Sequence, residues 1–278
     1  MNDVVVRRVL VALDASEPGR AALEAATVLA DRIGAEVAAL FVEDEDLLRL
    51  AGLPRATAFS VAGARPRALD PVSMGRELRI VGERLRRAVE DAASRLRVRA
   101  TFRATRGRVE AEILAAAREA DLVVIGRRGQ NAGPGALGST ARAVALSGRA
   151  VLLIAAEERL EAPVVVAVDG TAEGDAALDL AIAVARAARG RLVALAVRGA
   201  AASPQDVVRR TEERLRDLGL EAQVRPVGRG DAASLCAATR AVEGHTLVLP
   251  LHLTHDGDLE ACIANAPGPV VLVGRLPG

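Results

Sequence analysis

Two short segments of the chain carry residue types that together could hold a phosphorylated ligand. Asp14 follows an apolar run, and its carboxylate can accept hydrogen bonds from an amine or a ribose hydroxyl. Further on, Gly126-Arg-Arg-Gly129 is followed, after eight residues, by Gly138-Ser139-Thr140. Glycines let a backbone approach a phosphate closely, and the free amides at the start of a helix attract anions together with nearby hydroxyls. We therefore expect the two segments to contact opposite ends of a nucleotide, with Arg127 and Arg128 either adding charge or pointing into water.

The chain contains two copies of one sequence unit. A shift of 155 positions lays Val9–Val42 over Val164–Val197 without a gap, and 13 of these 34 positions are identical. Asp14 matches Asp169 in this register. Random overlap seldom places an aspartate at the same offset from an apolar run, so the match predicts a tandem duplication.

Each copy alternates apolar runs with helical stretches, which predicts the order βαβαβαβαβ. Caps at Ser16 and Thr171, and glycines at Gly34 and Gly190, should begin and end the first helix of each copy. The expected strands of the first copy are Val9–Leu13, Val37–Val42, Val98–Thr105, Asp121–Ile125 and Ala150–Ile154. Those of the second copy are Val164–Val168, Leu192–Val197, Ala222–Val227, Thr246–Leu249 and Val270–Val273.

This alternation predicts an α/β fold of two tandem, doubly wound, five-stranded parallel sheets. We expect one domain over residues 1–158 and the other over residues 159–278. Doubly wound sheets bind ligands at the carboxyl ends of their strands, where the strand order reverses. The stretch Glu43–Ser73 is much longer than its counterpart in the second copy, and it is either a lid or an excursion.

These residues resemble the tandem universal stress proteins, in the branch that binds ATP. That branch carries a strand-end aspartate and a loop of the form G-x-x-G, nine residues, G-[S/T]; this chain has Asp14 and a gap of eight. The resemblance implies a Rossmann-like fold of the adenine nucleotide alpha hydrolase type, a regulatory role in the stress response, and bound ATP, with which Mg²⁺ could also bind. From the adenine side to the phosphates, it implies contacts from Ala12, Leu13, Asp14, Val42, Ile125, Gly126, Gly129, Gly138, Ser139 and Thr140.

The second copy departs from this pattern. It keeps Asp169, but Pro250–Gly257 contains neither the glycine pair nor G-[S/T], so we expect it not to bind nucleotide in the same way. The resemblance also implies that the last strands, Ala150–Ala155 and Pro269–Val273, pair within one chain as an internal pseudo-dimer. A homodimer of the whole chain is a further arrangement that the sequence leaves open.

The composition excludes several classes of function. The 37 basic residues are all arginines, and the chain has no lysine for a Schiff base or a Walker A loop. A net charge of +1 and three phenylalanines, without tryptophan or tyrosine, do not suit nucleic-acid binding. No run approaches the roughly 18 apolar residues of a membrane span, so we expect no membrane partner. Cys236 and Cys262 are too few and too far apart in sequence for a metal-type cysteine pair or a disulfide framework, which fits a reducing cytoplasm.

Other interpretations of the same residues stay open. Gly133-Pro-Gly135-Ala-Leu-Gly138 matches a dinucleotide fingerprint with Glu157 about 20 residues on, although it does not follow a strand directly. The three histidines, His245, His252 and His255, lie close to Cys262 and could hold a metal, but their spacing fits no structural zinc pattern. Asp14 and the glycines could serve turns alone.

The main alternative function is that of a structural or interaction scaffold, which has the same fold but binds no nucleotide. No paired carboxylates, nucleophile or general base can be recognised near the glycine loop, so we expect a binding protein and not an efficient enzyme. Slow ATP hydrolysis and an adenylating or nucleotide-hydrolysing enzyme of a related fold are weaker alternatives.

Overall fold

The computed structural model describes residues 6–53, 57–58, 67–68, 70–127, 137–148, 150–154, 158–199, 203–228, 230–254 and 258–274. The first half of the chain supplies β1 (Arg8–Leu13), β2 (Glu36–Asp44), β5 (Ala100–Gly107), β6 (Leu122–Gly126) and β7 (Ala150–Ile154). The second half supplies β8 (Val164–Val168), β9 (Leu192–Ala196), β10 (Gln223–Pro226), β11 (Thr246–Pro250) and β12 (Val270–Val273). The α/β alternation expected from the sequence is confirmed.

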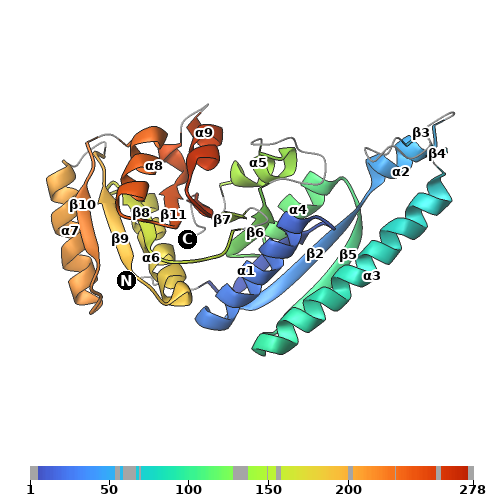
Figure 1. Ribbon diagram of the computed structural model, residues 1–278, viewed down its shortest axis with the longest axis horizontal. Helices are drawn as coiled ribbons and strands as arrows, with labels where there is room; N and C mark the ends of the chain where they lie inside the picture. The colour runs from blue at the N-terminus through green and yellow to red at the C-terminus, as the bar shows by residue number, and fades with distance from the viewer. Residues whose placement is uncertain are drawn as a thin grey trace.

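The strands of both halves join into a single sheet that runs the length of the molecule (Figure 1). Within the described residues its order is β10-β9-β8-β11-β12-β7-β6-β1-β2-β5. All neighbours within a half are parallel, whereas β12 and β7 are antiparallel, with Leu153 opposite Val270. The last strands of the two copies therefore pair, as in the expected internal pseudo-dimer. Because that pairing is antiparallel, the carboxyl ends of the strands lie at opposite edges of the sheet in the two halves.

Helices cover both faces of the sheet. One face carries α1 (Glu17–Ile33), α3 (Pro71–Leu96), α6 (Ala172–Ala188) and α7 (Pro204–Asp217). The other face carries α4 (Val109–Ala117), α5 (Ser139–Ala145), α8 (Ala232–Ala241) and α9 (Asp258–Asn265).

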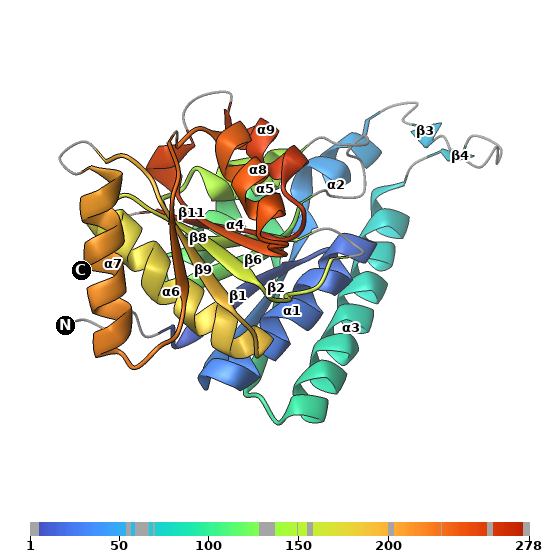
Figure 2. The ribbon, with the colours of Figure 1, turned by 60° about the vertical axis from the view of Figure 1, so that its left-hand side comes forward.

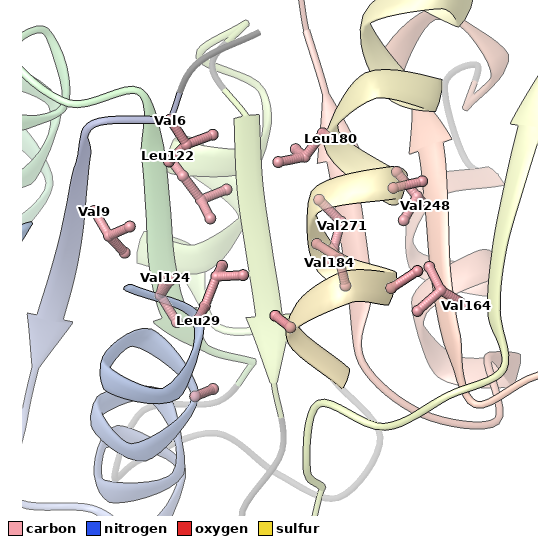
Figure 3. Packing of buried hydrophobic residues seen from close by; sticks show 14 of the residues in the cluster. Val6, Val9, Leu29, Leu122, Val124, Val164, Leu180, Val184, Val248 and Val271 are labelled. Atoms are coloured by element: carbon pink, nitrogen blue, oxygen red, sulfur yellow. The ribbon is translucent and has the colours of Figure 1, made fainter. Parts of the chain in front are cut away.

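Each face has its own apolar cluster, and both clusters continue across the junction of the halves. Figure 3 shows the first of them, with Leu29 and Val124 from the first half and Leu180 and Val184 from the second. Helices α1 and α6 pack against each other over this junction. Burying apolar surface on both faces explains why inner strands such as β8, in which every residue is buried, are nearly continuous apolar runs.

The first helix of each half has the expected N-cap. The Ser16 hydroxyl accepts from the Gly19 amide at 3.1 Å, and the Thr171 hydroxyl accepts from the Gly174 amide at 3.0 Å. Helix α1 ends at Gly34 in the left-handed conformation, with φ of 70°.

The C-cap expected for α6 was wrong. Arg189, and not Gly190, takes the left-handed conformation there, with φ of 53°. Arg189 is the residue that the repeat aligns with Gly34. Gly190 meets a different requirement, because a Cβ there would clash with the Cβ of Ala162.

The long stretch after β2 contains elements that the sequence did not indicate. Helix α2 (Glu45–Ala51) follows β2 directly, and its N-cap Asp44 accepts from the Asp46 amide at 2.9 Å. A two-stranded hairpin, β3 (Thr57–Ala58) with β4 (Arg67–Ala68), comes next. Both views place these elements beside the start of α3, at the β5 end of the sheet (Figures 1 and 2). The rest of residues 54–69 lies outside the described residues.

Candidate functional site

The order of the first-half strands reverses between β1 and β6, which makes their carboxyl ends the expected ligand edge. The register places Ala12 opposite Ile125 and Leu13 opposite Phe41. Val42 follows Phe41 on β2, so the residues expected on the adenine and ribose side lie on three neighbouring strands. The structure therefore brings Ala12, Leu13, Asp14, Val42 and Ile125 to one edge.

Asp14 is half-buried at the end of β1, and its two carboxylate oxygens differ in their hydrogen bonding. Oδ1 accepts from the Ser16 amide at 3.1 Å and from the Ser16 hydroxyl. Gly19 lies so close that a Cβ there would clash with Oδ1 and approach the Asp14 carbonyl oxygen to 2.8 Å. No residue in the described part of the chain bonds to Oδ2. One oxygen is thus used to hold the turn, and the other has no hydrogen-bond partner among the described residues.

A path of close contacts links Asp14 to the start of α5. Gly19 lies next to Gly126, since a Cβ on Gly126 would be 3.3 Å from the Gly19 nitrogen. After Gly126, the Arg127 carbonyl accepts from the Gly138 amide at 2.9 Å and closes the base of the glycine loop. Gly138 caps α5 without a side-chain acceptor, so the first amides of the helix carry no side-chain hydrogen bond at the cap.

The hydroxyls expected to contact the phosphates lie at this helix start. Ser139 is exposed and Thr140 is half-buried. Gly129, the second glycine of the pair, lies outside the described residues, as does Arg128. Gly126 has a packing role of its own, because a Cβ there would lie 2.8 Å from the Cβ of Pro18.

The structure corrects the expectation for Arg127, which was that its side chain adds charge at the ligand or points into water. Its guanidinium donates to the carbonyls of Ile263, at 3.0 Å, and Gly268, and pairs with Glu158 at 3.1 Å. The side chain is 12% exposed, and the carbonyls that it reaches belong to the second half. Antiparallel pairing of β7 and β12 places the end of β6 beside the chain that enters β12, which is why the side chain crosses the junction.

Arg127→Met should lower the free energy of unfolding by about 3 kcal/mol, because it removes a buried charge-assisted network and leaves Glu158 and two carbonyls without this donor. Urea unfolding followed by circular dichroism measures the change. Arg142→Met is the matched control: Arg142 also reaches the second half, at Glu260, but is 56% exposed, so its loss should cost under about 1 kcal/mol. Equal effects of the two variants would contradict the role assigned to Arg127.

The second half keeps the aspartate but uses both of its oxygens. Asp169 Oδ1 accepts from the Thr171 amide at 3.1 Å and from its hydroxyl at 2.7 Å. Oδ2 lies 2.6 Å from Nε2 of His252, which belongs to a short 3-10 helix, Leu251–Leu253, directly after β11. The side chain of Asp169 is only 3% exposed. Burial raises the pKa of Asp169, but the hydrogen bonds from Thr171 and His252 outweigh it and hold this pKa below its usual value.

This lowered pKa predicts a loss of stability in acid. A carboxyl whose pKa is lower in the folded than in the unfolded chain stabilises the fold above the unfolded value of about 3.9, and the contribution disappears as the pH falls through the folded pKa. Asp169→Asn should therefore be less stable than the wild type at pH 7, and the difference should shrink toward pH 3. Urea unfolding across this range measures it, and parallel pH profiles for the two proteins would show that the assignment is wrong.

The two cysteines, far apart in sequence, are neighbours in the fold. Cys236 of α8 and Cys262 of α9 are buried, with 3.9 Å between their Sγ atoms. Helices α8 and α9 pack against each other on one face of the second half, which brings the residues together. The signal available in the sequence was the winding itself, because successive crossover helices on one face are neighbours.

Among the described residues, no group of three histidine, cysteine, aspartate or glutamate side chains could hold a metal ion. His255 lies outside that part of the chain. The structure therefore bears on a metal site at the histidines only through His245 and His252. His252 is paired with Asp169, and His245 lies 3.8 Å from Glu161. No helix in the described ranges has the length and apolar character needed to cross a bilayer.

The family follows from a comparison with known proteins. A family model described as the universal stress protein family matches residues 6–154, more than half of the chain. The chain belongs to the universal stress protein family. No curated protein matches it in sequence.

Solved structures show the same fold along the whole length. A universal stress protein from Archaeoglobus fulgidus is 20% identical, with a TM-score of 0.68 over 97% of this chain and 96% of that one. A putative universal stress protein from Pseudomonas aeruginosa is 12% identical, with a TM-score of 0.57 over 97% and 94%. A universal stress protein in complex with cAMP is 20% identical over 55% of this chain, with a TM-score of 0.35. At these identities the first two likenesses show the fold alone.

Proposed function

We propose that this universal stress protein binds ATP in its first half, residues 1–158, and acts as a nucleotide-responsive regulator in the stress response. The observation that supports this most is the open Oδ2 of Asp14 at the β1–β6 edge, joined by close contacts to the start of α5. In this arrangement Oδ2 accepts from the ribose or the adenine amine. The α5 amides and the hydroxyls of Ser139 and Thr140 bind the phosphates.

The residues present fit the phosphate end of ATP without a lysine. Anions are stabilised at a helix N-terminus by its dipole and its unsatisfied amides, and the Gly138 cap leaves those amides without a side-chain acceptor. Mg²⁺, if it enters with ATP, would be held mainly by phosphate oxygens and water, as is usual for this ion. Gly129, which lies outside the described residues, completes the contacts that the family resemblance implies.

We propose that the second half, residues 159–278, binds no nucleotide. Both oxygens of Asp169 are engaged, one by Thr171 and the other by His252. His252 occupies the carboxylate oxygen that corresponds to the open one in the first half. The proposed regulator binds one ATP per chain and binds it without efficient turnover.

A scaffold without nucleotide is the second candidate, and two contacts favour it. Gly126 packs against Pro18, and Arg127 anchors the second half, so both residues have uses that need no ligand. In that case the joined sheet and its surfaces are the functional feature, and the first-half edge stays empty.

Equilibrium dialysis of the full chain with labelled ATP separates the two candidates. Ser139→Asp adds a negative charge where the phosphates would bind, while an acidic residue in the first turn suits the helix itself. We expect the wild type to retain ATP and Ser139→Asp to retain at least about tenfold less.

Gln205→Asp is the matched control. It adds the same charge to the exposed first turn of α7, far along the sheet, and should bind like the wild type. Equal retention by Ser139→Asp and the wild type would remove the proposed site, and no retention by the wild type would leave the scaffold.

A further inference from the structure

A pair of buried thiols lies between α8 and α9 in the second half of the chain. The Sγ atoms of Cys236 and Cys262 are 3.9 Å apart, and both side chains are fully buried. The Cys236 Sγ also lies 3.6 Å from the Cys262 carbonyl oxygen. Their neighbours are the apolar residues of the α4–α5–α8–α9 face, among them Leu235 and Ile263.

We propose that Cys236 and Cys262 form a reversible disulfide in response to a small peroxide. Since a disulfide bond is about 2.05 Å long, the sulfurs must approach by roughly 2 Å, which side-chain rotation and a small shift of α9 can supply. Both cysteines belong to the same apolar cluster and lie on helices that pack against each other. No other cysteine in the chain can compete as a partner.

The surroundings favour Cys236 as the attacking sulfur. A hydrogen bond from the Cys262 thiol lowers the pKa of Cys236 to about 7, against the opposing effect of burial, and the charges of Arg240 and Arg127 contribute in the same direction. The thiolate is the nucleophile in such reactions, so this lowering of the pKa favours Cys236 over Cys262 as the attacking sulfur.

The reaction with hydrogen peroxide balances as follows. The Cys236 thiolate attacks one peroxide oxygen, the O–O bond breaks, and the hydroxide released takes a proton to become water. The Cys262 sulfur then attacks the resulting sulfenic acid, the S–O bond breaks, and the oxygen leaves as a second water with the Cys262 proton. Two thiols are oxidised to one disulfide, and one peroxide is reduced to two waters.

Burial determines when this happens. Neither cysteine exposes surface, so peroxide reaches the pair through local opening of α9, an eight-residue helix. Helix α9 also supplies the Ile263 carbonyl that accepts from Arg127 of the first half. The disulfide would thus fix α8 to the helix that contacts the junction of the two halves.

The test is the intact mass of the full chain before and after hydrogen peroxide, followed by digestion with trypsin under denaturing, non-reducing conditions. Trypsin cuts after Arg240, between the two cysteines, so only a disulfide holds their peptides together. We expect a loss of two hydrogens, a linked peptide pair, and restoration by dithiothreitol.

Cys262→Ala is the control and should give no linked peptide. Two thiols that remain open to alkylation after peroxide, or two cysteines that gain oxygen separately without a link, would each overturn the proposal. The wild-type result decides the question even where the variant fails to fold.

Discussion

Asp14→Asn should weaken ATP binding by roughly ten- to a hundredfold. A hydrogen bond to a charged group contributes about 1.5–3 kcal/mol, and about 1.4 kcal/mol is a factor of ten. Asparagine keeps an oxygen that can accept from Ser16, so the turn after β1 is preserved. It places an NH₂ group where Oδ2 would accept from the ligand, so a favourable contact becomes a clash of donors. Equilibrium dialysis measures the dissociation constant.

Asp169→Asn is the matched control for this prediction. The substitution is the same, at the residue that the repeat aligns with Asp14. It alters a carboxylate oxygen that His252 already occupies, so the affinity for ATP should stay at the wild-type value. A similar loss of affinity in both variants would mean that Asp14 acts through stability and not through contact with the ligand.

Leu153→Ala should lower the free energy of unfolding by about 2–5 kcal/mol, the usual range for removing a buried leucine side chain. Leu153 is fully buried in β7, opposite Val270 of β12, where the two halves of the sheet meet. The cavity would open in the cluster shared by both halves, and the surrounding strands cannot collapse into it without breaking their register. Urea unfolding measures the change.

The control for this variant is Leu146→Ala. Leu146 directly follows α5 and is 54% exposed, so its truncation should change stability by less than about 0.5 kcal/mol. If Leu153→Ala unfolds at the wild-type urea concentration, the junction between the halves does not contribute to the stability of the fold as described.

The fold could be predicted from the sequence because its signals are local. Apolar runs such as Val164–Val168 are buried on both faces and are strands with the expected bounds. The repeat then predicted the same order of strands and helices in the second half. The prediction that the two halves pair through their last strands, β7 and β12, depended on the family resemblance. Apolar edge strands of this kind could equally pair between two chains.

Tertiary contacts caused the failures. Gly190 was expected to end α6, but glycine serves there to avoid Ala162, a residue that only the fold brings near. The contacts of the Arg127 side chain depend on antiparallel pairing between the two halves, which no local sequence pattern encodes. The closeness of Cys236 and Cys262 in space, about which the sequence made no prediction, likewise depends on how α8 and α9 pack.

The candidate site was predicted in outline. The sequence indicated that Asp14 and the start of α5 lie at one edge, because strand ends of a doubly wound sheet converge there. It did not indicate that Ser16 occupies one oxygen of Asp14, nor that His252 pairs with Asp169. Both contacts follow from turns after the strands, whose side-chain directions depend on the folded backbone.

Calorimetric titration of the full wild-type chain with ATP tests the central claim most directly, because it measures both affinity and stoichiometry. The first-half edge has a carboxylate oxygen of Asp14 without a partner in the described chain, and a helix start. In the second half, His252 occupies the corresponding oxygen of Asp169. The expected result is saturable binding at one ATP per chain. Two ATP per chain, or no measurable heat with an unchanged melting temperature, would contradict it.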